Sequence, residues 1–140
     1  MAGPTSYEAQ IADWIRKQER MLDAIVQQSA ADVFELASRV KAGVTRGGTV
    51  TPGYVPRDTG FLAASAVFDL NGSQVAGGEA AATFGVTGMK AGDTAVLAWT
   101  AVYARKLHYE NGWLWVDNAA SQWQDIVARN VARAERAVGG

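Results

Sequence analysis

The sequence predicts a single α+β domain over residues 1–140, with a long N-terminal helix, an antiparallel sheet of three to four strands and a C-terminal helix. Three observations support this prediction: a helical pattern over residues 5–42, strand-like segments over residues 62–102, and a second amphipathic pattern after Asp117. The chain is long enough for one hydrophobic core, and no internal repeat divides it.

The N-terminal helix is predicted over residues 5–42, where apolar side chains recur at intervals of three and four with charged side chains between them. Thr5 and Glu8 fit a capping box at its start, and Gly43 can end it. An unbroken helix of this length would measure about 55 Å at 1.5 Å per residue, which exceeds the width of a domain of this size. We therefore expect either a break near residues 27–29 or an end that projects and packs on a neighbouring molecule.

Residues 43–60 are predicted to form a flexible loop. The segment contains five glycines and two prolines and has few apolar residues to anchor it. A loop of this length without structure of its own is uncommon in a compact domain unless it has a function. We therefore expect it to be mobile in the free protein.

The predicted sheet consists of three strand-like segments. Residues 62–70 alternate in polarity and lead into Asn71-Gly72, a strong signal for a hairpin turn. Residues 81–87 form a second candidate, and residues 94–102 a third that is apolar on both faces. Such a strand is expected either at the centre of a covered sheet or against a partner. Asp117 is predicted to cap the last helix.

The composition argues against several classes of function. The chain has no cysteine, which removes thiolate zinc sites and thiol nucleophiles, and its formal net charge of −1 disfavours a dedicated nucleic-acid binder. No apolar run approaches the length of a membrane-spanning helix, and the start lacks the pattern of a secretory signal. We therefore expect a protein without membrane partners that is cytosolic at synthesis.

Catalytic motifs are also absent from the sequence. His108 is the only histidine, and no serine lies in a Gly-x-Ser-x-Gly elbow that could pair with it. The acidic residues match neither a calcium loop nor a catalytic carboxylate pair, and the glycine-rich stretches lack the ending of a P-loop. We therefore expect no catalytic residue, cofactor or metal site, and we interpret His108 as an ordinary surface or packing residue.

Two tryptophans near the last helix have two possible roles. Trp113 and Trp115 flank Leu114 in an extended segment, so both point to one face while Leu114 and Val116 point to the other. If Leu114 and Val116 face the helices of the chain itself, the tryptophans are free to anchor a neighbouring subunit. The alternative is that both tryptophans fill the core of the chain.

Two segments resemble those of a known protein family. Residues 56–65 read Pro-Arg-Asp-Thr-Gly-Phe-Leu-Ala-Ala-Ser, and residues 102–112 read Val-Tyr-Ala-Arg-Lys-Leu-His-Tyr-Glu-Asn-Gly. In the first segment, Gly60 is expected to supply a left-handed backbone for a turn before the strand that follows. In sequence and in order, both segments resemble those of the small tail-completion, or head–tail joining, proteins of long-tailed bacteriophages. The candidate residues for assembly that follow, with the two tryptophans added, are Arg57, Asp58, Thr59, Gly60, Leu62, Ser65, Tyr103, Ala104, Tyr109, Glu110, Gly112, Trp113 and Trp115.

The resemblance implies a structural protein of the virion rather than an enzyme. Members of this family are thought to form homo-oligomeric rings, often six-fold, that end the tail tube and meet the head connector. By that resemblance the partners would be further copies of this chain, the head connector and the tail tube protein. DNA would pass through the ring without sequence-specific binding, and a near-neutral chain suits such a lining. The protein would be found in the neck or tail of the virion, and in the host cytoplasm during assembly.

The same resemblance implies how the ring would be held together. Sheet edges and helices would pair between subunits, and the 43–60 loop would become ordered on contact with the next ring. A head-side connector or minor capsid protein is an alternative within the same setting. A small enzyme or a nucleic-acid-binding module with an unrecognised site is the alternative outside it.

Overall fold

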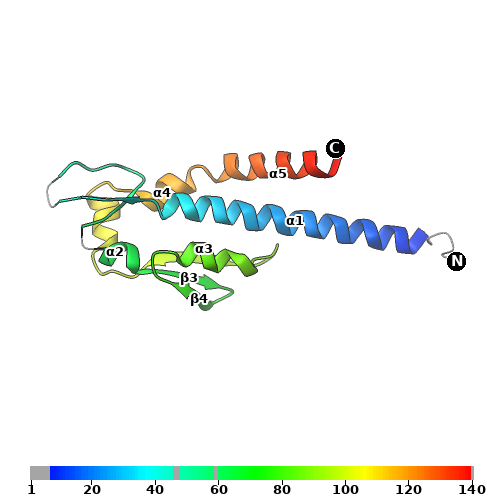
Figure 1. Cartoon of the computed structure of the whole chain (residues 1–140), viewed down its shortest axis with the longest axis horizontal. Helices are drawn as coiled ribbons and strands as arrows, with labels where there is room; N and C mark the ends of the chain where they lie inside the picture. The colour runs from blue at the N-terminus through cyan, green and yellow to red at the C-terminus, as the bar shows by residue number, and fades with distance from the viewer. Residues whose placement is uncertain (1–6, 46–47, 59, 140) are drawn as a thin grey trace.

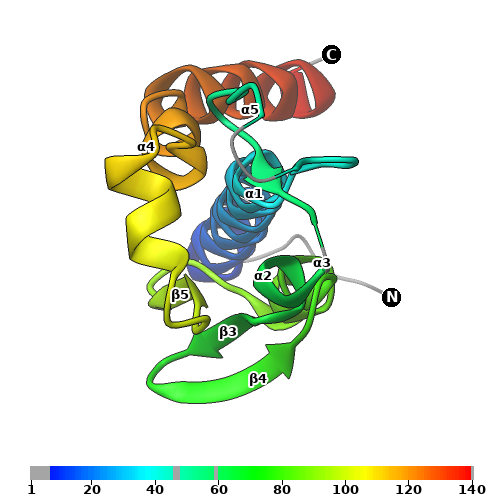
Figure 2. The ribbon, with the colours of Figure 1, turned by 90° about the vertical axis from the view of Figure 1, so that its left-hand side faces the viewer.

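The computed structural model describes residues 7–45, 48–58 and 60–139, and it confirms the predicted α+β fold (Figure 1). In chain order the elements are α1 (Tyr7–Ala37), β1 (Val40–Lys41), β2 (Val55–Pro56), α2 (Phe61–Ala64), β3 (Ala66–Leu70), β4 (Ser73–Gly77), α3 (Ala81–Gly85), η1 (Val86–Gly88), β5 (Ala95–Trp99), η2 (Lys106–Glu110), α4 (Trp115–Ala120) and α5 (Trp123–Gly139). Viewed from its end, α1 lies between α5 on one side and the sheet with α2 and α3 on the other (Figure 2).

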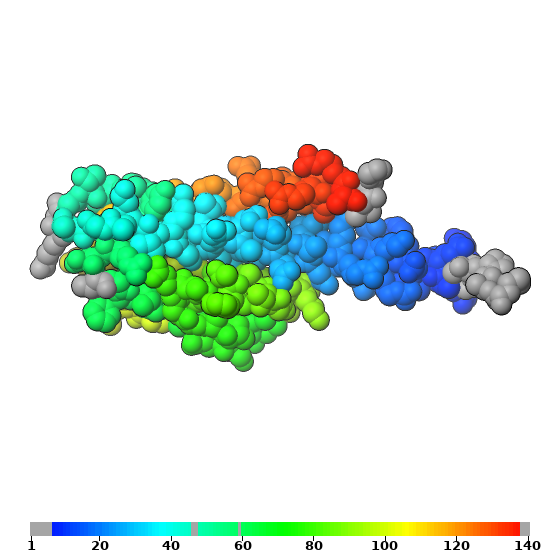
Figure 3. All heavy atoms as spheres, viewed as in Figure 1, coloured from blue at the N-terminus to red at the C-terminus, as the bar shows by residue number. Residues whose placement is uncertain are grey.

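Helix α1 is continuous over 31 residues, so the expected break near residues 27–29 is wrong. At 1.5 Å per residue it is about 46 Å long. Its N-terminal end projects beyond the rest of the molecule, as the other alternative predicted (Figures 1 and 3). The helix ends at Ala37 rather than at residue 42, because β1 leaves it to pair in parallel with β2. The predicted cap at Thr5 lies outside the described residues.

Helix α5 runs antiparallel to α1 and is joined to it by polar contacts (Figure 1). The Nδ2 of Asn130 donates to Ser29 Oγ at 3.1 Å and to Asp32 Oδ2 at 3.0 Å, and Arg129 lies 3.3 Å from the same carboxylate. Burial tends to raise the pKa of Asp32, but hydrogen bonds from Asn130, Gln28 and Arg129 outweigh it and hold this pKa below its ordinary value. Since buried polar groups require partners, these bonds fix the register of the two helices.

The C-terminal helical region differs from the prediction at its start. It is divided into α4 and α5, and Asp117 lies in the first turn of α4 rather than at its cap. Leu114 occupies the cap position with a left-handed backbone at φ 45°. The predicted Asp117 cap is wrong because His108 supplies the acceptor instead, as described below.

The main sheet is antiparallel, in the order β4-β3-β5. Asn71 and Gly72 join β3 to β4 with φ values of 53° and 87°, which confirms the hairpin predicted at this dipeptide. Strand β5 lies at an edge, so the first alternative for segment 94–102, a central strand, is wrong, and the second, a face against a partner, stays a prediction. The sheet contains three strands among the described residues.

Two segments predicted as strands are helical. Residues 62–64 belong to α2, and residues 81–88 form α3 and η1 between β3 and α1. Helix α3 comes so close to β3 that a Cβ on Gly85 would overlap the ring of Phe68. The run of small residues in 81–88 has no clear hydrophobic period, so the sequence alone does not indicate strand or helix. Packing between the sheet and α1 decides its conformation.

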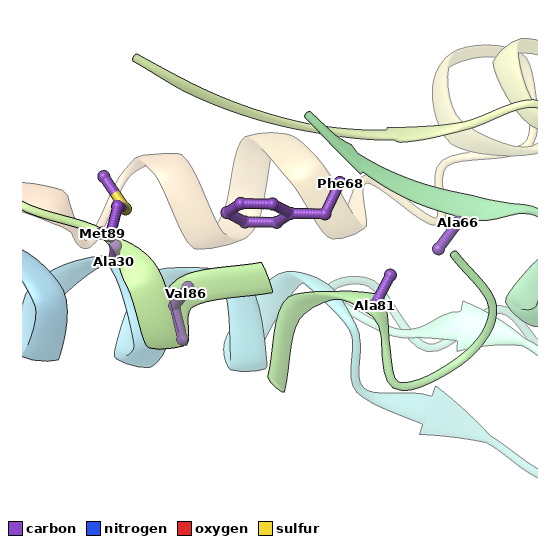
Figure 4. Close-up of a cluster of buried hydrophobic side chains, with 6 residues drawn as sticks. All are labelled: Ala30, Ala66, Phe68, Ala81, Val86 and Met89. Atoms are coloured by element: carbon purple, nitrogen blue, oxygen red, sulfur yellow. The ribbon is translucent and has the colours of Figure 1, made fainter. Parts of the chain in front are cut away.

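The hydrophobic core has two parts. The first, shown in Figure 4, lies between α1, the sheet and α3, and Phe34 packs edge to face on Phe68 with ring centroids 5.3 Å apart. Its buried members are Ala30, Ala66, Phe68, Ala81, Val86 and Met89. The second part lies where β2, α2 and the segment after β5 meet, and its buried members are Val55, Leu62, Ala63, Ala104, Trp113 and Trp115.

The segment 43–60 is partly packed into this second core. Val55 in β2 is buried, and its N–H donates to Arg39 O at 2.6 Å. The N–H of Gly53 donates to Trp113 O at 2.7 Å. The expectation that the segment lacks an apolar anchor is therefore wrong at Val55, while its mobility stays a prediction.

Candidate functional site

The two segments that carry the family resemblance meet at one cleft. The cleft has a volume of about 640 Å³. Helix α2, which contributes Leu62 to the lining, lies at the end of the molecule away from the N-terminus (Figure 1). The cleft is lined by Val44, Thr45, Gly48, Val50, Pro56, Asp58, Gly60, Leu62, Tyr103, Lys106, Leu107, Asn111 and Trp113. Two segments that are separated by 36 residues in the sequence thus line one surface.

The first segment turns sharply and then enters α2. Gly60 lies at the helix cap with φ 89°, a left-handed conformation that favours glycine, as predicted. Leu62 is buried in the second core, and Ser65 Oγ donates to Leu62 O at 2.7 Å. The carbonyl of Ser65 also accepts bonds from both the N–H and the hydroxyl of Thr100, at 3.1 and 3.0 Å. This segment is therefore fastened directly to the chain that follows β5.

Arg57 and Asp58 lie on the exposed side of the same turn. Arg57 Nη1 lies 2.8 Å from Glu79 Oε1, which ties the turn to the start of α3. Asp58 is exposed and borders the cleft. Thr59, the remaining candidate of this segment, lies outside the described residues.

The second segment contains the π-helical turn η2. Ala104 is buried and the N–H of Leu107 donates to Tyr103 O at 3.1 Å, so the backbone enters this turn already helical. Tyr103 is partly exposed and lines the cleft, whereas Tyr109 lies further round the turn with the Arg105 guanidinium 5.4 Å from its ring centre. A π-helical turn is rare and occurs often at functional sites, because it redirects side chains that an α-helix would space evenly.

Glu110 and Gly112 end this segment. Glu110 is exposed, and Gly112 has φ 81°, which reverses the chain after the π-helical turn. The N–H of Trp113 then donates to Leu107 O at 3.2 Å. Glycine is favoured at position 112 because the left-handed backbone strains other residues.

Trp113 and Trp115 face the core, which is the second of the two predicted alternatives, so their interpretation as anchors for a neighbouring subunit is wrong. Their exposed fractions are 3% and 2%, whereas Val116 on the opposite face is 39% exposed. The left-handed backbone of Leu114 turns the chain so that both indoles point inward. The alternation placed the two tryptophans on one face, and because a tryptophan buries more apolar area than a leucine or valine, that face is the inner one. Trp113 forms the floor of the cleft rather than an exposed anchor.

His108 joins the cleft segment to α4. It is buried, and its Nε2 accepts hydrogen bonds from the N–H of Val116 at 3.1 Å and of Asp117 at 3.4 Å. In its neutral form, with the ring proton on Nδ1, its side chain therefore caps the free N–H groups at the start of α4. The ring packs edge to face on Trp115, with centroids 4.8 Å apart. Burial lowers the pKa of His108, and the carboxylate of Asp117 at 3.9 Å opposes this in part.

The cleft is lined mainly by apolar surface. Its polar lining consists mainly of Asp58, Lys106, Asn111 and Thr45, spread around an apolar floor. Within residues 7–45, 48–58 and 60–139, no cluster of three or more histidine, aspartate or glutamate side chains could hold a metal ion. The lone pair of His108 is occupied by α4, so it is not available as a general base.

Sequence reasoning missed part of the cleft lining. Val44, Thr45, Gly48 and Val50 come from the segment interpreted as an unanchored loop, and no pattern in the sequence pointed to them. Lys106, Leu107 and Asn111 lie inside the second resembling segment but were not singled out. The π-helical turn directs them to the cleft, and its five-residue spacing is not visible in a sequence scanned for ordinary helical periods.

Comparison with protein-family models, with curated proteins and with solved structures found no match to this chain. Of the helices that the structure describes, none combines the length and hydropathy required to cross a lipid bilayer.

Proposed function

We propose that this chain is a structural subunit of the bacteriophage neck or tail, where it forms a homo-oligomeric ring that joins the head connector to the tail tube. The observation that carries this proposal is the meeting of the two family-like segments at one cleft. If each of these segments only stabilised its own turn, the two would not need to lie on the same surface. A head-side connector or minor capsid protein is the alternative within the same setting.

The chemistry of the cleft favours assembly over catalysis. Its floor is apolar, built by Leu62, Leu107 and Trp113, and its exposed rim carries one acidic and one basic side chain, Asp58 and Lys106. Protein interfaces have such an apolar centre with a polar rim. The cleft is therefore proposed as the surface that receives a segment of a neighbouring ring or subunit.

The sheet offers the contact that would close the ring. In the described part of the chain, β4 and β5 each pair only with β3, so each has one free edge. The N–H of Thr100 donates to Ser65 O, and the N–H of Asn71 donates to Thr94 O. Because bonding alternates along antiparallel strands, Val96 points its backbone groups toward β3, and Ala95 points its own away.

Pairing of β4 in one copy with β5 in the next would join two different surfaces. Such a head-to-tail contact either closes into a ring or continues as a filament. Main-chain hydrogen bonds would supply its affinity, and no basic residues are needed to hold the DNA that passes through. Six copies would make the ring that the resemblance implies.

The proposal is tested by native mass spectrometry and negative-stain imaging of the purified protein, alone and with purified head connector and tail tube proteins. The expected result is a ring with an open centre that binds at least one of these partners. Retention on DNA that weakens steeply with salt, without a ring, would instead favour a nucleic-acid-binding module. A protein that stays monomeric under all these conditions would refute the ring.

A matched pair of variants tests the strand contact. Ala95→Pro removes an N–H that points away from β3, and it is expected to abolish ring formation while the melting temperature stays near that of the parent protein. Val96→Pro removes an N–H that β3 uses, and it is expected to lower the melting temperature instead. Normal rings from Ala95→Pro would show that the β5 edge does not join the subunits.

A further inference from the structure

The N-terminal part of α1 extends beyond every other element. Asn130 of α5 lies opposite Ser29 of α1, and the two helices run antiparallel. The end of α5, Gly139, is nine residues after Asn130, so it lies level with the residue of α1 that is nine before Ser29, about residue 20. On the sheet side, the hydrogen bond from the N–H of Ala91 to Asp23 Oδ1, at 2.9 Å, marks how far the loop before β5 reaches along α1. Residues 7–19, here called the projecting segment, lie beyond both (Figures 1 and 3).

The projecting segment carries an apolar stripe on one face. Tyr7, Ile11, Trp14 and Ile15 are 77%, 43%, 62% and 43% exposed. At 100° per residue they fall on the same face of α1 as Ser29, which α5 covers further along the helix. The stripe therefore continues the surface that α5 buries, past the point where α5 ends.

The charges of the projecting segment and its next residue are balanced, which narrows the kind of partner. Three acidic residues are matched by three basic ones: Glu8, Asp13 and Glu19 against Arg16, Lys17 and Arg20. An amphipathic helix that binds anionic lipid carries an excess of basic residues on its polar face, and a nucleic-acid partner requires one too. A balanced helix with an apolar stripe instead suits another balanced helix of the same kind.

We propose that the projecting segments of two copies of this chain pack antiparallel against each other. In each copy, α5 leaves the stripe uncovered only from Tyr7 to about Gln18. The length of this uncovered part sets how far the two α1 helices can overlap. Residue n then lies opposite residue 25 − n of the second copy, so Tyr7 faces Gln18, and Ile11 faces Trp14. Ile11 and Trp14 thus meet at the centre of the contact, Ile15 lies opposite Gln10, and Glu8 comes level with Lys17 of the second copy. This register brings no like charges together.

The area available implies a weak, concentration-dependent dimer. The four exposed apolar side chains present roughly 500 Å² per copy, given that a large aromatic side chain presents 150–250 Å². Two copies would bury roughly 1,000 Å², which is at the lower limit for a specific interface. The contact is thus suited to joining subunits reversibly. It does not depend on the ring proposed above, because it leaves the cleft and the sheet edges free.

Disulfide trapping tests the antiparallel register directly, since the chain has no cysteine of its own. In a Tyr7→Cys/Gln18→Cys variant the two cysteines of one chain are about 16 Å apart along the helix, too far to bridge. The proposal expects an oxidised dimer in which peptide mapping finds only 7–18 linkages. The control, Asp13→Cys/Arg20→Cys, places both thiols on the opposite face, and no dimer is expected from it.

Two results of the disulfide trapping would overturn the proposal. Linkages of 7 to 7 and 18 to 18 would show a parallel pair, and the absence of any linkage at high protein concentration would show that the second copy does not bind there.

Sedimentation gives an independent reading. In the Ala95→Pro background, which is expected to form no ring, the protein is expected to dimerise as its concentration rises. The same protein with Trp14→Glu added is expected to remain monomeric, with the melting temperature of Ala95→Pro alone, because the Trp14 side chain lies outside the core. If Trp14→Glu still dimerises, the stripe is not the contact.

Discussion

Protonation of His108 is expected to destabilise the protein between pH 7 and pH 5. Neutral Nε2 accepts the hydrogen bonds from Val116 and Asp117 that cap α4, and the imidazolium form has no acceptor to offer them. Loss of a helix cap costs about 1–2 kcal/mol. For a domain of this size that corresponds to a fall in melting temperature of roughly 3–10 °C. The attraction of the imidazolium for Asp117 at 3.9 Å offsets a small part of this loss.

The direction of the effect follows from the lowered pKa of His108 in the folded protein. The unfolded chain binds this proton at higher pH than the folded chain does, so stability rises with pH through the interval between the two pKa values. The contribution is fully present above the ordinary histidine pKa of 6.5 and is lost as the pH falls through the lower, folded value. Asp32 and Asp93, whose pKa values are lowered from 3.8, titrate below this window.

The assay is a series of thermal melts from pH 8 to pH 5, with the imidazole pKa followed by NMR. Because His108 is the only histidine, its ring signals need no assignment. The matched variant, His108→Gln, cannot titrate in this range and is expected to melt at a temperature that changes little across it. A parent melting temperature that stays level or rises toward pH 5, or an NMR pKa at or above 6.5, would refute this account of the cap.

Three further predictions concern the cleft and its support. Gly60→Val is expected to cost about 1–3 kcal/mol in unfolding free energy because of the backbone at φ 89°, whereas Gly88→Ala, with open space at the Cβ position, serves as the near-neutral control. Trp113→Ala and Trp115→Ala are each expected to cost about 3–5 kcal/mol in urea unfolding, as core residues do; unchanged stability with lost assembly would restore the interface role. Limited trypsin digestion is expected to spare the bond after Arg57, whose backbone N–H and carbonyl are both bonded; early cleavage there would show that this part of the 43–60 segment is mobile.

The elements that sequence reasoning predicted correctly depend on local physics. The Asn71-Gly72 turn requires two positive φ values, which these residues tolerate better than most. In α1 the helical spacing of apolar residues repeats over so many turns that a strand or a loop is excluded. The segment 81–87 was predicted wrongly because its alternation is too weak to separate strand from helix. There the close approach of Gly85 to Phe68 decides the structure, and such a contact between distant residues leaves no local signal.

The candidate site shows the same division. Gly60 was predicted to have a left-handed backbone, and it has one. The prediction was possible because a glycine at a turn indicates a backbone conformation that other residues adopt only with strain. The orientation of Trp113 and Trp115 depends instead on Leu114 at φ 45°, an uncommon conformation for a leucine that nothing in the local sequence indicates. The cap supplied by His108 depends on a contact eight residues away through a π-helical turn, which a search for capping residues next to α4 does not reach.

Burial of the two tryptophans also limits how copies of this chain can hold together. With both indoles in the core, neither of them can serve as the aromatic anchor of the kind that dominates tight interfaces. Association through the free edges of β4 and β5 would rely on main-chain hydrogen bonds, each of which is weak in net terms. A ring satisfies many such edges at once, so its closure would be cooperative while each single contact stays reversible. We therefore expect few intermediates between free subunits and closed rings, and partially closed arcs in negative-stain images would argue for a stronger pairwise contact than the strand edges provide.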